Sequence, residues 1–128
     1  MQLSLSNHSA SIGKDGTPIT SFAMKEGDTE AIPLDLTDKD GNPLDITGHT
    51  GKITITSEPG GRALVRDAPI NILTPATGKA EYRWTDSNQT KGKAGEYFCE
   101  VILTNTTTGK ERTIPGGKYG QVFILPRL

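Results

Sequence analysis

Cysteine, histidine and aromatic residues are scarce in this 128-residue chain. The one cysteine, Cys99, excludes an internal disulfide and favours folding in a reducing compartment. His8 and His49 are the two imidazole groups for general acid–base catalysis, and three Phe, three Tyr and one Trp offer few stacking platforms. We therefore expect a protein that is not an enzyme and that needs no cofactor.

Net charge and long apolar segments are also lacking. The formal net charge is −1 and no run of five like charges occurs, whereas a nucleic-acid-binding protein presents a basic face to the phosphates. No apolar stretch approaches the roughly 18 residues that a membrane-spanning helix requires. The start of the chain has neither the basic nor the apolar region of a secretory signal. We expect neither a nucleic-acid partner nor a membrane partner.

Threonine, glycine and proline are abundant instead, with 17, 15 and 8 residues against 8 alanines. The branched Cβ of threonine suits the pleated surface of a sheet, and glycine and proline interrupt long helices. A length of 128 residues suits a single domain. Composition therefore predicts an all-β domain built from short strands.

Turn residues divide the chain into short segments whose apolar residues alternate. Turn signals rich in Gly, Asp, Asn and Pro recur every 8–15 residues. Between them, apolar positions two residues apart are typical of half-buried strands. We predict strands at about residues 30–36, 51–57, 62–65, 70–73, 80–84, 97–103 and 122–125. Residues 1–12 are predicted to form an N-terminal arm and residues 13–128 the domain itself.

The segment from Ala94 to Val101 contains the pattern Gly-x-Tyr-x-Cys, in which Tyr97 precedes Cys99 by two residues. This pattern resembles strand F of immunoglobulin-like domains, where the tyrosine hydroxyl bonds back to the preceding backbone as a tyrosine corner. The resemblance implies an immunoglobulin-like antiparallel β-sandwich of about seven or eight strands. Because there is no second cysteine, Cys99 is expected to be a small buried hydrophobic residue. Trp84 does not lie at the spacing found in antibody domains.

Several weak motifs follow one another in an order that is informative as a whole. They are Lys-Glu-Gly-Asp-Thr at 25–29, Asp-Gly-Asn-Pro at 40–43, Thr-Gly-Lys-Ala-Glu-Tyr at 77–82, Ala-Gly-Glu-Tyr at 94–97 and Phe-Ile-Leu at 123–125. This order is similar to the N-terminal domain of the baseplate upper protein of tailed phages that infect Gram-positive bacteria. The resemblance implies a virion structural role, in which the module docks a fibre or receptor-binding part onto the tail. The longer protein of this family continues beyond the position of Leu128, where this chain ends. Because of this difference, we expect a docking, decoration or adaptor role.

Oxygen-bearing side chains between residues 35 and 45 raise the alternative of a calcium site. They are Asp35, Asp38, Asp40, Asn42 and Asp45. The glycine in this segment comes too early for an EF-hand loop, and no bidentate glutamate follows at the required distance. A solvated hairpin turn explains the same residues, so we expect no metal site.

Two of the predicted strands are apolar on both faces. Phe98 and Ile102 lie opposite the core-facing positions of the strand at 97–103, and the segment 122–125 is apolar throughout. In an immunoglobulin-like sandwich these are the neighbouring strands F and G, so their outward residues would form one apolar patch of the kind that marks protein contacts. We predict that Phe98, Ile102 and one of Phe123 or Ile124 pack against another subunit. The alternative is that the N-terminal arm covers this patch.

These observations favour a structural module of a tailed-phage particle, at the baseplate, a tail-fibre attachment or the virion surface. Its expected partners are other virion proteins, with a homo-oligomer as one option, and its expected location is the virion after assembly in the host cytoplasm. The alternative is a carbohydrate- or ligand-binding adhesin module, for which Trp84 or Tyr119 would supply the aromatic platform.

Overall fold

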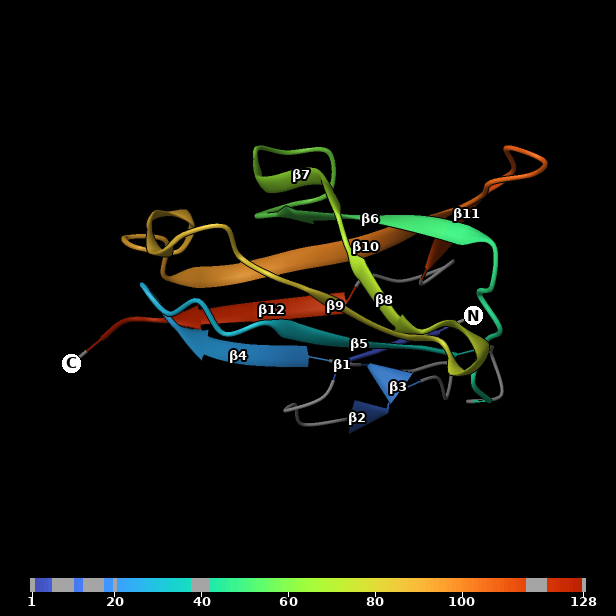
Figure 1. The fold of residues 1–128 in the computed structure, drawn as a ribbon. Coiled ribbons are helices and arrows are strands. Elements are labelled where there is room, and N and C mark those ends of the chain that lie inside the picture. The colour runs from blue at the N-terminus through green and yellow to red at the C-terminus, as the bar shows by residue number, and fades with distance from the viewer. Residues whose placement is uncertain are drawn as a thin grey trace.

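Two β-sheets pack face to face in this chain (Figure 1). The computed structural model describes residues 2–5, 11–12, 18–19, 21–37, 42–114 and 120–127. The first sheet has the order β1-β5-β9-β8, and its strands are Gln2–Leu5, Ile32–Thr37, Lys79–Tyr82 and Asn71–Thr74. The second sheet has the order β4-β12-β10-β6-β7, and its strands are Ser21–Lys25, Gly120–Leu125, Gly95–Asn105, His49–Thr56 and Ala63–Pro69.

Shorter elements complete the described part of the chain. Strand β11 (Glu111–Ile114) pairs with the C-terminal half of β10, while β12 pairs with its N-terminal half. Strands β2 (Ser11–Ile12) and β3 (Pro18–Ile19) form a separate two-stranded sheet. Two single turns of 3₁₀-helix, Pro75–Thr77 and Ser87–Gln89, are the helical elements of the described residues. The predicted all-β class is therefore confirmed.

The strand order is that of an immunoglobulin domain. In sheet order, β1-β5-β9-β8 corresponds to strands A-B-E-D, and β12-β10-β6-β7 corresponds to strands G-F-C-C′ of a variable-type domain. All pairings within the two sheets are antiparallel except that of β4 with β12. The predicted immunoglobulin-like sandwich is confirmed. Counted over the described residues, the sheets hold four and six strands, a few more than the seven or eight expected.

Strands β1, β4 and β11 lie outside the segments that were predicted as strands. Strand β4 places Phe22 and Met24 in the core, and β11 places Ile114 there. Strand β1 lies in the segment that was expected to be an arm, yet it pairs with β5, with Leu3 opposite Leu36. Residues 2–5 therefore extend the first sheet instead of lying over the outer face of β10.

The core lies between the sheets and is built from alternate residues of the predicted strands. In β5, β6 and β10 every second side chain is buried: Ile32, Leu34, Leu36, Ile53, Ile55, Cys99, Val101 and Leu103. Burying a side chain of this size contributes about 1.5–3 kcal/mol relative to leaving it in water. Trp84 follows β9 and is only 6% exposed, with its ring 5.1 Å from that of Tyr82 in an edge-to-face arrangement. The sandwich is therefore closed by apolar packing without a disulfide.

Candidate functional site

The strand β10 divides its side chains between the core and the outer face of the second sheet. Cys99, Val101 and Leu103 are buried in the core. The residues between them, Phe98 and Ile102 among them, are half-buried and point to the other side of the sheet. The predicted orientation of Phe98 and Ile102 therefore agrees with the strand geometry.

The neighbouring strand β12 separates the two predicted candidates Phe123 and Ile124. Ile124 is 1% exposed and belongs to the core together with Val122. A side chain enclosed between the two sheets cannot contact another subunit, so Ile124 is removed from the predicted interface. Phe123 is half-buried on the outer face, and Leu125, two residues further along the same face, is 42% exposed. Sequence reasoning missed Leu125, although its alternation with Phe123 would have indicated it.

The pairing register brings these outward residues together. Phe98 lies opposite Gln121, and Phe123 is two residues beyond Gln121, so the two phenylalanines are diagonal neighbours on adjacent strands. Ile102 follows Phe98 on the same face of β10, between Thr113 on β11 and Lys52 on β6. We call Phe98, Ile102, Phe123 and Leu125 the outer stripe.

Tyr97 stands at the start of β10, where the chain enters the sheet. Its hydroxyl donates a hydrogen bond of 2.6 Å to the backbone carbonyl of Lys93, four residues upstream. This bond is of the type expected for a tyrosine corner and supports that assignment. The ring packs against the core, and burial raises the pKa of the Tyr97 hydroxyl.

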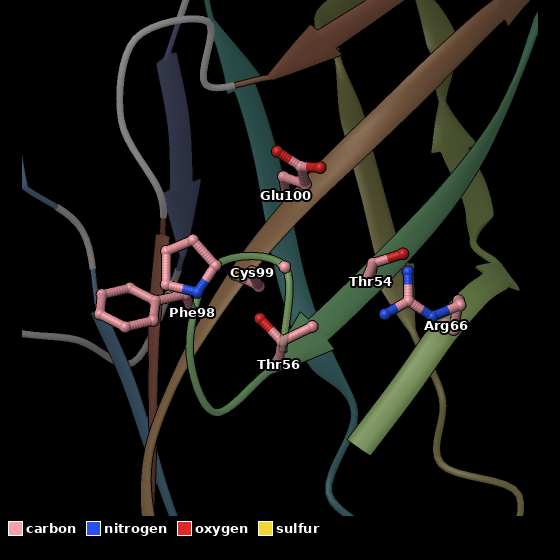
Figure 2. Close-up of a pocket in the computed structure, with 8 residues that line it drawn as sticks. Thr54, Thr56, Arg66, Phe98, Cys99 and Glu100 are labelled. Atoms are coloured by element: carbon pink, nitrogen blue, oxygen red, sulfur yellow. The ribbon is translucent and has the colours of Figure 1, made fainter. Parts of the chain in front are cut away.

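A pocket of about 200 Å³ opens on the outer face, beside Phe98. Figure 2 shows Phe98 and Glu100 of β10, Thr54 and Thr56 of β6 and Arg66 of β7 around it. Pro59 and Gly60, in the loop between β6 and β7, complete the wall. The pocket therefore adjoins the middle of the outer stripe through Phe98, which lies between Ile102 and Phe123 along the paired strands.

A β-bulge shapes the Arg66 side of this pocket. Ile53 pairs with Ala68 and Ile55 with Val65, so the single residue Thr54 faces both Arg66 and Asp67. Asp67 has a φ of +50°, which is unusual for a residue other than glycine. Its backbone N–H donates to the Thr54 hydroxyl oxygen at 3.0 Å, and this bond holds the bulge.

The nucleophile and base candidates are poorly placed for catalysis. The Cys99 side chain is buried, and burial, with a smaller effect from the Glu100 carboxylate, raises the pKa of its thiol to about 12. Nδ1 of His49 lies 3.1 Å from the Thr47 carbonyl oxygen in an exposed turn. His8 lies outside the described residues.

The acidic segment is accounted for by turn and strand contacts as far as it is described. Asp35 forms an ion pair of 2.8 Å with Lys79 on the adjacent strand. Asp45 accepts hydrogen bonds from the Thr47 hydroxyl and backbone N–H, at 2.6 and 3.0 Å, and these bonds lower the pKa of the Asp45 carboxyl. Asp38 and Asp40 lie outside the described residues. Among the residues that are described, no three His, Cys, Asp or Glu side chains form a group able to hold a metal.

The family comparison agrees with the strand order. The family model of the BppU N-terminal domain matches residues 1–114. The chain belongs to the BppU N-terminal domain family. This family is the N-terminal domain of the phage baseplate upper protein and is a phage baseplate structural domain, which confirms the resemblance seen in the sequence. None of the curated proteins compared with the chain is a match.

Membership of the BppU family places the chain among virion proteins that contact other virion proteins. Over the described ranges, no helix has the length and apolar character needed to cross a membrane. The adhesin alternative loses its tryptophan platform, because Trp84 is packed in the core and a ligand cannot reach its ring. Tyr119, the other platform considered, lies outside the described residues.

Proposed function

We propose that this BppU-family domain docks with a neighbouring virion protein through the outer stripe. The observation that carries the proposal is the position of four large apolar side chains on one outer face, across the adjacent strands β10 and β12. The Leu125 side chain is 42% exposed, so an apolar partner surface would gain free energy by removing it from water. Surface complementarity is the mechanism, and we propose no catalytic step.

Charged residues lie both within and beside the outer stripe on the same face. Glu96 and Glu100 alternate with the apolar residues of β10, while Lys25 and Lys52 lie on the flanking strands β4 and β6. Complementary charges across an interface favour the correct partner over others. The partner surface is therefore expected to combine apolar residues with charged groups that complement these glutamates and lysines.

The first sheet offers a second route for assembly. Strand β8 is an edge strand of that sheet, and its Leu73 side chain is 58% exposed. Edge strands have free backbone groups that can pair with a strand from another copy or another protein. Because β8 lies on the other sheet, it provides a control surface for the proposal.

The experiment compares two variants during particle assembly. One chain carries Phe98→Ser and Ile102→Ser, and the control carries Leu73→Ser. The amount of each chain in purified particles is measured by quantitative mass spectrometry, and circular dichroism with thermal unfolding shows that both remain folded. The double variant is expected to be incorporated about tenfold less than the unchanged chain, equivalent to about 1.4 kcal/mol of docking free energy.

The control is expected to be incorporated normally. Normal incorporation of the folded double variant would show that the outer stripe does not dock. A loss caused by Leu73→Ser alone would instead assign docking to the edge of the first sheet.

A further inference from the structure

The pocket beside Phe98 is lined by the polar side chains of Thr54, Thr56, Arg66 and Glu100. Thr56 is 8% exposed, and its side chain forms part of the pocket wall. Figure 2 shows this hydroxyl directed toward the space that Phe98, Glu100 and Arg66 surround. The Thr56 hydroxyl is therefore available to a ligand.

Opposite charges face this space without neutralising each other. Glu100 and Arg66 line the same pocket, yet these two described side chains do not form an ion pair with each other. Arg66 makes one long hydrogen bond, of 3.3 Å, to the Gly61 carbonyl oxygen. The Glu100 carboxylate accepts hydrogen bonds and the Arg66 guanidinium donates them. Together they favour a neutral ligand whose adjacent groups can both donate and accept hydrogen bonds.

The walls and the size of the pocket restrict the ligand further. Phe98 and Pro59 present ring surfaces, which suit a ligand that has one apolar face. The volume of about 200 Å³ is smaller than the roughly 300–1,000 Å³ of sites for drug-sized ligands. A single ring with hydroxyl groups matches these limits.

The backbone beside the pocket is held in an unfavourable conformation. Asp67, with its φ of +50°, lies in the bulge that presents Arg66, and Thr54 fixes it through the 3.0 Å bond to the Asp67 N–H. Bulges reorient side chains next to binding sites, and strained residues other than glycine concentrate at ligand-binding positions. The bulge is a second feature, independent of the Thr56 hydroxyl, that marks this pocket as a binding site.

We infer that this pocket binds one ring of a neutral saccharide. The apolar face of the ring packs on Phe98 and Pro59. One of two adjacent hydroxyls donates to the Glu100 carboxylate, and the other accepts from the Arg66 guanidinium. A third hydroxyl bonds to Thr56. This inference does not depend on docking through the outer stripe, because Phe98 is the one stripe residue in the pocket lining, which does not include Ile102, Phe123 or Leu125.

The test is a titration of the isotope-labelled chain with glucose, galactose, N-acetylglucosamine and rhamnose, followed by amide chemical shifts in NMR. At least one sugar is expected to shift the amides of Thr56, Gly60 and Glu100 in a saturable way, with a dissociation constant in the millimolar range. The variant Glu100→Gln keeps the size of the side chain but removes its charge. It is expected to weaken binding about tenfold, because a hydrogen bond to a charged group is lost.

Glu96→Gln is the matched control, because Glu96 is an exposed residue of the same strand face but does not line the pocket. It is expected to leave the affinity unchanged. The unshifted spectrum of each variant outside the pocket shows that it is folded. The inference is overturned if no sugar shifts these amides at about 50 mM, or if Glu100→Gln binds as tightly as the unchanged chain. It is also overturned if N-acetyltyrosinamide saturates the pocket and the sugars do not, since the pocket then accepts a protein side chain.

Discussion

The hydroxyl of Tyr97 donates a 2.6 Å hydrogen bond to the backbone carbonyl of Lys93. The bond ties the loop before β10 to the first residues of the strand. Strand β10 carries Phe98 and Ile102 on its outer face and Val101 and Leu103 in the core. The position of the outer stripe therefore depends on how firmly the start of this strand is held.

Removal of this hydroxyl is expected to destabilise the domain moderately. Tyr97→Phe keeps the ring in its packing site but leaves the Lys93 carbonyl without its donor. The free energy of unfolding should fall by about 0.5–1.5 kcal/mol, measured by urea denaturation. Lys93→Ala is the control, because it keeps the backbone carbonyl, and it should be close to neutral. Equal stability of Tyr97→Phe and the unchanged chain would contradict a structural role for the bond.

Gly78 is expected to tolerate no side chain. It has a φ of +70°, and a Cβ atom there would overlap the Leu36 carbonyl oxygen and lie 2.9 Å from that of Leu44. Gly48 has a similar φ of +80° but open space around it. Gly48→Ala should therefore cost only the conformational penalty of about 1–2 kcal/mol. Gly78→Ala should cost clearly more, because it adds a steric overlap. Thermal unfolding of the two variants would contradict this account if their losses were equal.

The Cys99 thiol is expected to be unreactive in the folded domain at pH 8. Its pKa is raised to about 12, and its side chain is buried, so neither a thiolate nor access is available. A disulfide reagent should modify the chain in guanidinium chloride but not in buffer. Rapid modification of the native protein would show that β10 opens locally.

The same pKa shift sets the direction of a pH effect on stability. Below the ordinary thiol pKa of 9.0, Cys99 is protonated in both the folded and the unfolded states. Between about pH 9 and pH 12 only the unfolded state releases the proton, so the contribution of Cys99 to stability falls as the pH rises. Cys99→Ala should remove this part of the pH dependence in urea denaturation.

Thr90 is expected to stabilise the loop before β5. The side chain is completely buried; its hydroxyl accepts from the Gly27 N–H at 2.8 Å and donates to the Asp28 carbonyl at 3.2 Å. Thr90→Val keeps the shape but leaves both backbone groups unpaired, at a cost of about 1–3 kcal/mol. Thr90→Ser keeps the hydroxyl and should lose less. The reverse order in chemical denaturation would show that the methyl group matters more than the two bonds.

The sheet-forming part of the fold could be predicted wherever one face of a strand was apolar and the other polar. Ile32, Leu34 and Leu36 alternate with polar or half-buried residues, and all three are buried as expected. Strand β11 gave no such signal, because its pairing with β10 follows from the tight turn at 105–109 rather than from its own side chains.

The candidate site was predictable only in part, for the same reason. In β12 both faces are apolar, so the sequence did not show whether Phe123 or Ile124 faces the core; pairing of Val122 with Tyr97 determines it. The pocket was not predictable, because it requires the bulge opposite Thr54 and the loop that carries Pro59. Both features depend on the register between β6 and β7, which no local pattern specifies.

Hydroxyl-radical footprinting of assembled particles tests the central claim most directly. The rates of oxidation at Phe98, Ile102, Phe123 and Leu125 are compared between the isolated domain and the particle, with Leu73 on the first sheet as the internal reference. Docking through the outer stripe predicts several-fold slower oxidation of these four side chains in the particle and an unchanged rate at Leu73. Equal rates at the four side chains in both states would contradict the proposed docking surface.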